Sequence, residues 1–425
     1  MKRVLIIGHN VFDKRTALGK TLLSFFSGWS PDRLAQLYFH SEVPTCRECQ
    51  NYYRITDKEA LKSFLNPFKK IGRKFKKEDI RTDAVSSRTD SGITSKIYSF
   101  GRKRTPLIYI LRNLIWVNMS RRKSGLLEWV KEFNPDVIFF AAGDYKFAYD
   151  ITSYIAKLLN IPVVMYCSDD YYINRLNPDL RFSNVVYKHL MKSVFKTVSH
   201  TSHIITICDK MAKQYSKLFD VPITTVYTGY SRICDINPDG ERIAYLGNLG
   251  FSRYECLIDI GRVLKGIKKE DGTYWYLDVY STENREHILK HLTSDNGIVF
   301  HGAVGQKQVE DIIDNSLLVV HTESFSEENI YKVKYSVSTK IADLLASGHC
   351  ILAYGPNNIA SIEYLAENNS ACVINKKEDL KETVLQIIGN REKRQKYINN
   401  AHNLAMKNHS PQAVAKEIKK IIEEV

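Results

Sequence analysis

The chain has 425 residues, a formal net charge of +14, 44% hydrophobic and 25% charged residues. Because single hydrophobic cores stop growing at about 250–300 residues, this length predicts two domains. No apolar run reaches the roughly 18–20 residues that a membrane-spanning helix needs, so the sequence predicts no such helix. The short apolar start, Val4–Ile7, is followed by polar residues, and it predicts a first buried strand rather than a signal peptide.

The eight cysteines are spread along the chain and do not predict a disulfide framework. Cys46 and Cys49 form one CxxC pair without a second pair or a nearby Cys/His pair, so a structural role is favoured over zinc or redox chemistry. We therefore expect no metal and no cofactor. Unpaired thiols indicate a reducing compartment, and the sequence predicts a cytoplasmic protein.

The positive charge predicts anionic partners and is concentrated in the first third of the chain. Three basic clusters stand there: 69–77, 102–104 and 121–123. Phe64, Phe68 and Phe75 interleave with the first cluster, a mixture that suits the surface of an anionic membrane. A solvated loop without a partner is the other interpretation. Nucleic acid is disfavoured, because no zinc-finger spacing, RNP motif or KH-type loop is present.

Short apolar runs alternate with longer helical patterns, which predicts βα units and two parallel sheets. In the first half the expected strands are 3–8, 34–39, 136–141, 162–167, 203–207 and 224–227. In the second half they are 242–246, 275–280, 297–300, 317–321, 350–353 and 371–374. The expected helices of the second half are 253–268, 283–293, 306–314, 338–347, 359–367, 378–389, 391–408 and 411–424.

These elements group into two α/β domains of the Rossmann-like, doubly wound type. We predict an N-terminal domain over 1–230, a linker over 231–240 that is rich in Gly, Pro, Asn and Asp, and a second domain over 241–408. Residues 409–425 are expected to form a helix that crosses back to the first domain. Residues 66–104 are polar and basic, and we expect a long loop or insertion there.

The segment 335–348, YSVSTKIADLLASG, carries the most specific pattern. Ser338 or Thr339 can cap a helix whose apolar face is buried, and Lys340 adds a cation to the free N–H groups of its first turn. Asp343 follows one turn later on the same side, where it can accept hydrogen bonds from hydroxyl groups such as those of ribose. Taken alone, this segment is equally a capped helix of a Rossmann-like domain.

Further motifs precede that segment in a fixed order: YLGNLGFSR over 245–253, LDVYS over 277–281, and VFHGAVGQKQVEDIIDNSLLVVHT over 299–322. Together with 335–356 they resemble the donor domain of GT-B glycosyltransferases, in particular the retaining family 4 and its capsule- and lipopolysaccharide-type members. The resemblance covers about 180 residues and implies a GT-B fold, with two Rossmann-like domains that face a central cleft.

The resemblance implies roles for the residues at matching positions. Arg253 and Lys340 would contact the donor diphosphate and stabilise the charge that develops on the leaving nucleotide. Asp343 would hold the ribose hydroxyls. Further donor-binding residues are expected in the glycine turns and at the helix start: Gly19, Gly247, Gly250, His301, Gly302, Val304, Ser338 and Thr339.

In the first half the resemblance is looser. Residues 17–20 resemble the glycine turn that approaches the donor, and 167–172, CSDDYY, resemble an acidic loop directed at the cleft. Asp170 is the candidate catalytic carboxylate and Asp169 a candidate acceptor contact. Loop capping is the other interpretation of this pair, and metal binding a third. His9, His40 and His301 stand at strand ends, where a structural role is favoured.

One departure from the family pattern stands at Tyr335, where many members carry the first of two Glu residues eight positions apart; Asp343 holds the second position. Glu323, Glu327 or Glu328 could reach the donor sugar instead, and Glu327 is the residue we name. This departure weakens a retaining outcome more than a nucleotide-sugar site.

The sequence therefore predicts a hexosyl-type glycosyltransferase that moves a sugar from a UDP- or GDP-type donor to a glycan or lipid-diphosphate-linked acceptor. We further predict a role in surface polysaccharide biosynthesis, a retaining outcome, and peripheral contact with the inner face of an anionic membrane. Two alternatives remain open: a GT-B sugar-nucleotide epimerase, and a catalytically degenerate GT-B scaffold.

Overall fold

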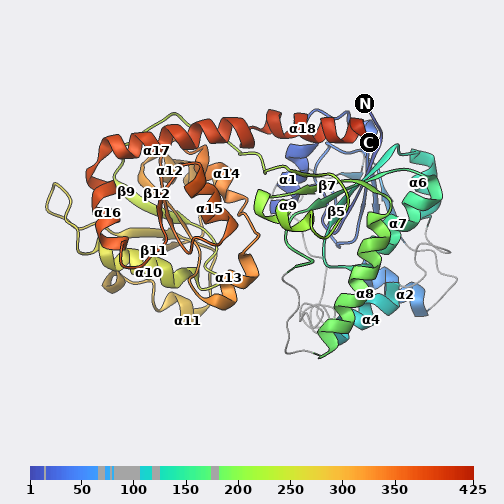
Figure 1. Cartoon of the computed structure of the whole chain (residues 1–425), viewed down its shortest axis with the longest axis horizontal. Helices are drawn as coiled ribbons and strands as arrows, with labels where there is room; N and C mark the ends of the chain where they lie inside the picture. The colour runs from blue at the N-terminus through green and yellow to red at the C-terminus, as the bar shows by residue number, and fades with distance from the viewer. Residues whose placement is uncertain (14–15, 66–71, 77–78, 81–105, 117–124, 174–180) are drawn as a thin grey trace. The chain divides into compact units, whose positions relative to one another are not determined.

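A computed structural model describes residues 1–13, 16–65, 72–76, 79–80, 106–116, 125–173 and 181–425 (Figure 1). The chain forms two compact units. Unit 1 comprises Met1–Val226 and Val414–Val425, and unit 2 comprises Tyr227–Ala413. The chain thus divides between Val226 and Tyr227.

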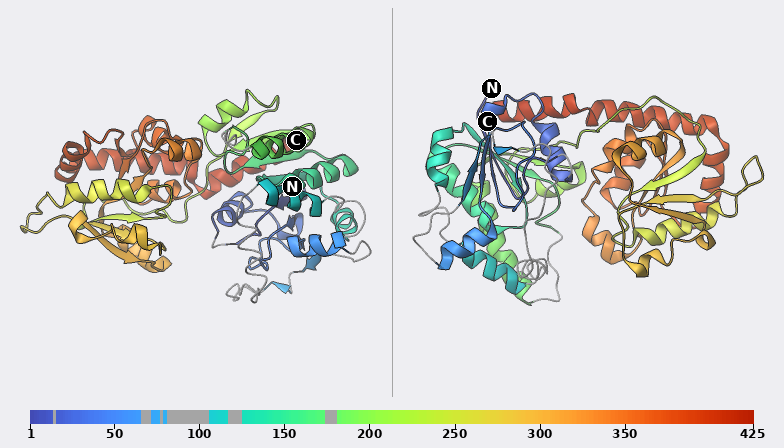
Figure 2. Two further views of the ribbon diagram at one scale, coloured as in Figure 1. Left: turned by 90° about the horizontal axis from the view of Figure 1, so that it is seen from below. Right: turned by 180° about the vertical axis from the view of Figure 1, so that it is seen from behind.

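Unit 1 is built on an eight-stranded sheet with the order β4-β3-β2-β1-β5-β6-β7-β8. All neighbours pair in parallel except β3 and β4, which are antiparallel. Helices lie on both faces of this sheet (Figures 1 and 2), so its central strands are buried on both sides and read as continuous apolar runs. The strands are β1 Val4–Gly8, β2 Leu34–Tyr38, β3 Asn51–Arg54, β4 Arg73–Phe75, β5 Val137–Ala142, β6 Val163–Cys167, β7 Thr201–Thr206 and β8 Ile223–Thr225.

All six strands predicted in the first half are present, whereas β3 and β4 were not predicted. β4 is an edge strand of three residues, and β3 is a four-residue strand between β4 and β2; β4 lies inside the stretch predicted as a loop or insertion over 66–104. That prediction is wrong at Arg73–Phe75, where Phe75 is buried against the sheet and the Arg73 guanidinium lies 4.5 Å from its ring. Most of 66–104 and the clusters 102–104 and 121–123 lie outside the described residues.

Among the helices of unit 1, α7, α8 and α9 pack on the sheet, whereas α2 and α4 pack on each other. Two helices, α6 and α7, end at Asn134 and Asn160, both in the left-handed conformation that Asn tolerates at a helix end. The helices are α1 Ala17–Phe25, α2 Asp57–Leu65, α4 Pro106–Trp116, α6 Leu126–Phe133, α7 Lys146–Leu159, α8 Arg181–Val198, α9 Asp209–Tyr215 and α18 Pro411–Glu424, with a 3-10 turn η1 at Pro31–Arg33.

Unit 2 is built on a six-stranded, all-parallel sheet with the order β11-β10-β9-β12-β13-β14. The order reverses between β9 and β12, because β10 and β11 lie on one side and β13 and β14 on the other. All six strands predicted for this half are present. They are β9 Arg242–Leu246, β10 Leu277–Tyr280, β11 Ile298–Gly302, β12 Ser316–Thr322, β13 Cys350–Tyr354 and β14 Cys372–Ile374.

The helices of unit 2 lie within the predicted ranges, with two exceptions. The helix expected over 283–293 is only Glu286–Leu289, and the helix Glu327–Val333 was not predicted. In the tail a π-helical turn, η4 Ala405–His409, follows α17, and Ser410 in an extended conformation separates this turn from the last helix, which begins at Pro411. The helices are α10 Arg253–Leu264, α11 Glu286–Leu289, α12 Gln306–Asp314, α13 Glu327–Val333, α14 Lys340–Leu345, α15 Ala360–Glu367, α16 Leu380–Gly389 and α17 Arg391–Leu404, with a 3-10 turn η3 at Ser294–Asn296.

Hydrogen bonds hold the two chain ends together in unit 1 and fix the segment 231–240 in unit 2. Within unit 1, the Lys2 ammonium donates a hydrogen bond of 2.8 Å to the carbonyl oxygen of Val425, so the two ends of the chain lie together (Figure 2). Within unit 2, the segment 231–240 packs along α14 and the start of β13: the Cys234 N–H donates to the Ala346 carbonyl, and the Asn237 N–H donates to the Gly348 carbonyl. The segment predicted as a linker is thereby fixed to unit 2.

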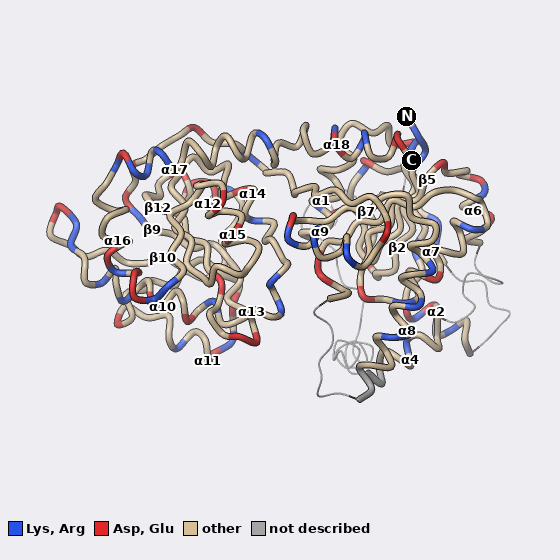
Figure 3. Tube along the Cα trace, viewed as in Figure 1, with Lys and Arg blue, Asp and Glu red and all other residues tan. Residues whose placement is uncertain are grey.

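Charged residues of both signs are interspersed along the helices of both units (Figure 3). The Cys46 and Cys49 side chains are buried, and burial raises the pKa of the Cys49 thiol to about 12, which leaves it a poor metal ligand or nucleophile at neutral pH. Within the described residues, no helix combines the length and apolar character needed to cross a membrane.

Candidate functional site

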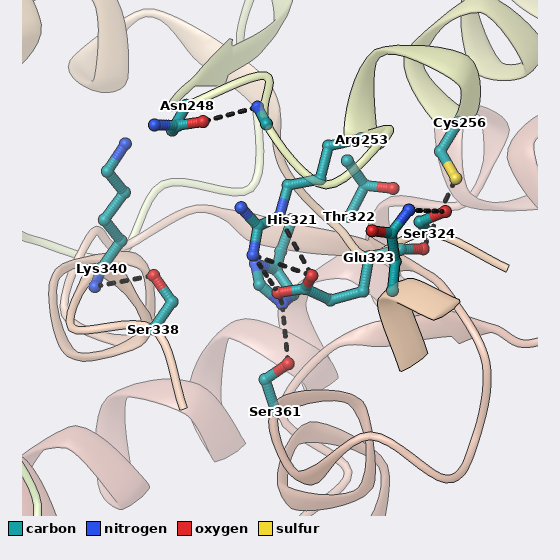
Figure 4. Close-up of polar contacts among 12 residues, drawn as sticks. Asn248, Arg253, Cys256, His321, Thr322, Glu323, Ser324, Ser338, Lys340 and Ser361 are labelled. Atoms are coloured by element: carbon teal, nitrogen blue, oxygen red, sulfur yellow. Dashed lines mark hydrogen bonds and ion pairs between the residues drawn. The ribbon is translucent and has the colours of Figure 1, made fainter. Parts of the chain in front are cut away.

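The candidate site of unit 2 lies at the carboxyl ends of β9 and β12, the two neighbouring strands between which the strand order reverses. Doubly wound sheets bind their ligands at this place, because the loops that leave the two strands diverge there. The loop after β9 leads to Arg253, and β12 leads directly to Glu323. Lys340 begins α14 nearby and reaches back toward β9 (Figure 4).

The turn between β9 and α10, residues 247–252, has an unusual backbone. Gly247 donates its N–H to the Tyr280 carbonyl oxygen at 3.0 Å, and the Gly250 N–H donates to Asn248 Oδ1 at 2.5 Å. Phe251 and Ser252 then adopt φ angles of 56° and 54°, a left-handed conformation that side-chain-bearing residues rarely adopt. Two strained residues in succession place Arg253 at the first position of α10.

Arg253 is held by a two-pronged ion pair with Glu323 (Figure 4). Its Nε lies 3.0 Å from Glu323 Oε2 and its Nη2 lies 3.0 Å from Oε1. The Glu323 side chain is only 4% exposed and that of Arg253 17%. Burial raises the pKa of the Glu323 carboxyl and the Arg253 guanidinium opposes that rise. The ion pair orients the Arg253 guanidinium. Lys340 is the second cation of the site.

Lys340 donates a hydrogen bond from its ammonium to the carbonyl oxygen of Leu246, the last residue of β9, at 2.9 Å. The residue reaches solvent, but protein atoms surround it densely. This partial loss of hydration, together with the nearby Arg253 guanidinium, lowers the pKa of Lys340 to about 8. An anionic ligand would raise this pKa again, because its negative charge stabilises the charged form of the ammonium group.

His321 lies beneath the ion pair on β12. Its Nε2 is 3.2 Å from the Ser361 hydroxyl and 3.8 Å from Glu323 Oε1. Burial, with Arg253 and Lys340 acting in the same direction, lowers the pKa of His321 to about 3. A neutral imidazole therefore packs under Glu323 and adds no third positive charge to the site.

The sequence offered Ser338 or Thr339 as the cap of α14. Thr339 occupies the cap position in a helical conformation, and its side chain makes no capping hydrogen bond. Ser338 Oγ lies 3.4 Å from the Lys340 N–H, at the long end of the range for a hydrogen bond. Asp343 accepts a hydrogen bond of 2.7 Å from the Ser231 N–H, which ties 231–240 to this helix. Its role toward ribose stays a prediction.

The predicted base-contacting segment follows β11. His301 stacks on Tyr280 with a ring separation of 4.5 Å and an interplanar angle of 9°, and its Nε2 is 2.7 Å from Asp278 Oδ1. Gly302, the last residue of the strand, has a φ of 75°, and Val304 packs against the cluster of Ala244, Tyr280 and Ile312. The turn is thus braced from the neighbouring strand β10, and its contact with a base stays a prediction.

Glu323 is the carboxylate of this site, whereas Glu327, the residue named from the sequence, is exposed at the start of α13. Tyr335, which replaces the first family Glu, is 7% exposed and packs into unit 2 without offering a carboxylate. Glu323 follows the predicted strand 317–321 by two residues. The rule that strand ends carry site residues would have singled it out.

In unit 1, the acidic loop after β6 is organised by Asp170. Its Oδ1 accepts hydrogen bonds from the Tyr172 and Ile173 N–H groups, at 3.1 and 3.0 Å, and from the Tyr215 hydroxyl at 3.1 Å. This is the loop-capping role that the sequence left open, and a catalytic role for Asp170 stays a prediction. Asp169 is exposed, and its Oδ1 accepts from the Asp170 N–H at 2.9 Å.

Gly19 lies in α1 and is buried, rather than exposed in a turn. A Cβ atom there would come within 2.2 Å of the Asp13 carbonyl oxygen, and the Gly19 N–H caps onto Thr16 Oγ1 at 3.1 Å. Close packing of α1 against the preceding loop therefore accounts for this glycine. Its predicted approach to the donor is not needed to explain it.

Two family models match the chain. "Glycosyltransferase Family 4" matches residues 69–231 and "Glycosyl transferase-like" matches residues 272–420, which together span most of its length. No curated protein matches the chain by sequence.

Among solved structures, HepE from Anabaena in complex with UDP aligns over 100% of both chains with a TM-score of 0.61 and 12% identity. WaaG, a glycosyltransferase involved in lipopolysaccharide biosynthesis, aligns over 98% of this chain and 99% of its own, with a TM-score of 0.55 and 12% identity. The trehalose-6-phosphate synthase OtsA aligns over 99% and 98%, with a TM-score of 0.62 and 8% identity.

Two doubly wound α/β units and full-length agreement with these structures define the GT-B fold. The chain belongs to glycosyltransferase family 4. It is accordingly a glycosyltransferase of the class that uses nucleotide-sugar donors.

Proposed function

We propose that the chain transfers a hexosyl unit from a UDP- or GDP-type sugar to a glycan or lipid-diphosphate-linked saccharide, with retention at the anomeric carbon. Unit 2 binds the donor, with the diphosphate between Arg253 and Lys340. The observation that carries this proposal is the convergence of these two cations at the carboxyl ends of β9 and β12.

The two cations would act on the leaving group. As the glycosidic bond breaks, negative charge grows on the diphosphate, and cations already fixed in place stabilise it without reorganisation. Glu323 fixes Arg253, and the Leu246 carbonyl fixes Lys340. HepE forms a complex with UDP, which supports a uridine donor here, and the choice of base is left to the experiment.

Thermal shift with UDP, GDP, CDP and ADP tests the donor site, because a ligand at 100 times its Kd stabilises a protein by about 2.7 kcal/mol. We expect a shift with one nucleotide in the wild type and its loss in Lys340→Ala. Lys265→Ala is the matched control, since Lys265 is an exposed lysine of the same unit beside Asp295. A folded wild type that shifts with no nucleotide would contradict the donor site and favour a scaffold.

Product analysis distinguishes transfer from epimerisation. With the nucleotide-sugar identified by the binding panel, a transferase forms nucleoside diphosphate only with an acceptor, and the new linkage keeps the donor's anomeric configuration by NMR. An isomerised nucleotide-sugar formed without acceptor would show the epimerase alternative instead.

We also propose peripheral contact with an anionic membrane from the cytoplasmic side. Helices α2 and α4 pack together and expose four large apolar side chains, Leu61, Phe64, Leu111 and Leu114. Co-sedimentation with phosphatidylserine vesicles should fall when Phe64 and Leu111 are replaced by Ser, and should not change for Leu158→Ser, an exposed leucine of α7. Equal sedimentation of all three proteins would contradict the membrane contact.

A further inference from the structure

A cavity of about 750 Å³ opens in unit 2 between α10 and the loops that follow β12 and β14. Its lining includes Tyr254 and Asp259 from α10, Phe325 from the loop after β12, and Lys377 from the loop after β14. Pockets that hold small molecules range from about 300 to 1,000 Å³ and combine aromatic side chains with a few polar groups. This cavity therefore has the size and the mixed lining of a ligand site.

The cavity is separate from the two cations that converge at β9 and β12. Neither Arg253 nor Lys340 is among its lining residues. Cys256 lies at the boundary: its thiol donates a hydrogen bond of 3.4 Å to the Glu323 carbonyl oxygen, whereas the Glu323 side chain binds Arg253 (Figure 4). A ligand in this cavity would thus meet residues other than those proposed to hold the diphosphate.

The charges around the cavity balance. Among the described residues that line it, three are cations and three are carboxylates: Arg262, Lys376 and Lys377, and Glu255, Asp259 and Glu378. A strongly charged ligand of either sign would be attracted by one set and repelled by the other. The lining therefore favours a ligand that is polar but carries no net charge.

One ion pair of the lining offers an acceptor and a donor side by side. Lys377 Nζ lies 2.9 Å from Asp259 Oδ1, and the two side chains are 68% and 19% exposed. A carboxylate only accepts hydrogen bonds and an ammonium only donates them, whereas a hydroxyl group does both. Two adjacent hydroxyl groups on one ring can therefore match this pair, one with the carboxylate and the other with the ammonium.

An exposed aromatic ring accompanies that ion pair. Phe325 is 37% exposed, and its ring packs on Tyr354 with the ring centroids 5.0 Å apart. The Tyr354 hydroxyl lies 3.5 Å from Asp259 Oδ2, so one buried tyrosine contacts both Phe325 and the ion pair. A sugar ring has an apolar face of C–H groups and a rim of hydroxyl groups, and this arrangement offers a partner to each.

We propose that this cavity binds an uncharged saccharide, with one ring stacked on Phe325 and two adjacent hydroxyl groups hydrogen-bonded to Asp259 and Lys377. The cavity is then a second carbohydrate site, which rests on the residues of unit 2 alone and does not depend on the proposed transfer reaction. Because Arg253 and Lys340 take no part in it, the saccharide binds whether or not a nucleotide is present.

Titration by saturation-transfer NMR on the full chain tests the site with maltose, lactose, cellobiose and N,N′-diacetylchitobiose as probes. We expect at least one of them to bind the wild type. Phe325→Ser removes the stacking ring and should weaken that binding by about fivefold. Asp259→Asn keeps the shape of the side chain but removes its charge, and should weaken binding by about tenfold, as the loss of a hydrogen bond to a charged group does.

Matched controls change the same chemistry elsewhere in unit 2. Asp295→Asn alters another aspartate–lysine pair, Asp295 with Lys265, and Tyr274→Ser removes another exposed aromatic ring; none of these residues lines the cavity. Both variants should bind the probe as the wild type does. Lys340→Ala should also bind it unchanged, although it loses nucleotide. A cooperative thermal transition shows that each variant is folded.

The site is overturned if no probe binds the wild type, or if folded Phe325→Ser or Asp259→Asn binds the probe as tightly as the wild type. An equal loss of binding in the controls, or in Lys340→Ala, also overturns it, because the probe would then bind elsewhere. Nucleotide binding on the same samples tests the donor site separately. Nucleotide binding without saccharide binding overturns the cavity alone, and saccharide binding without nucleotide binding supports the cavity and contradicts the donor proposal.

Discussion

The buried ion pair between Arg253 and Glu323 predicts an asymmetry between its two single substitutions. Replacing Arg253 with Leu leaves a carboxylate that is 4% exposed without its partner, and such a change costs about 3–5 kcal/mol. Replacing Glu323 with Leu leaves a guanidinium that is 17% exposed and can turn toward water. We expect that change to cost less, about 1–2 kcal/mol.

The double variant Arg253→Leu/Glu323→Leu should be more stable than Arg253→Leu alone, because it removes the uncompensated charge. Lower pH should reduce the cost of Arg253→Leu. Without Arg253, burial alone acts on Glu323 and raises its pKa further, so the carboxyl binds a proton in the folded state. The destabilisation of Arg253→Leu relative to the wild type should therefore shrink as the pH falls from 7 to 5.

Hydrogen-exchange mass spectrometry of the β12 and α10 peptides measures the opening free energy of unit 2 without requiring the whole chain to unfold in one step. The reasoning is refuted if Arg253→Leu and Glu323→Leu cost the same, or if the double variant is less stable than Arg253→Leu. Either result would mean that the surrounding structure rehydrates Glu323 when its partner is removed.

Three further predictions follow from the pKa values and backbone geometry. Because the pKa of Lys340 is lowered to about 8, nucleotide affinity measured by calorimetry should fall by about tenfold per pH unit above pH 8, whereas Lys340→Arg should give a flat profile up to pH 10. The pKa of His9 in the folded chain, about 4, lies below its unfolded value, so this residue should lower the free energy of unfolding by up to about 3 kcal/mol as the pH falls from 6.5 to 4. Urea unfolding of His9→Phe should show a smaller loss over the same range. An equal loss would contradict the buried neutral ring. Gly297→Ala should destabilise by about 2–4 kcal/mol in thermal unfolding, because its φ is 70° and a Cβ would lie 1.9 Å from the Gly261 carbonyl oxygen. Gly272→Ala, with a φ of 84° but open space around it, should cost only about 1 kcal/mol.

The strands could be predicted because burial on both faces of a parallel sheet leaves continuous apolar runs such as Val4–Ile7. The strands β3 and β4 could not, since they have only four and three residues, part of them exposed, and therefore carry little pattern. The cap of α14 could not be assigned to one residue either. Thr339 is of a capping type, but whether its side chain caps the helix depends on its backbone conformation, which the packing of α14 decides.

The sequence by itself determined the fold and the family, because these rest on periodicity and on motifs whose order along the chain is fixed. It also located Arg253 and Lys340, since each stands at the start of a helix after a recognisable strand and turn. Only the tertiary structure decided that Glu323 holds Arg253, that Asp170 closes a turn, and that His9 Nδ1 is buried without a hydrogen-bond partner. Partners, burial and protonation depend on residues that are distant in the chain, and no local pattern records them.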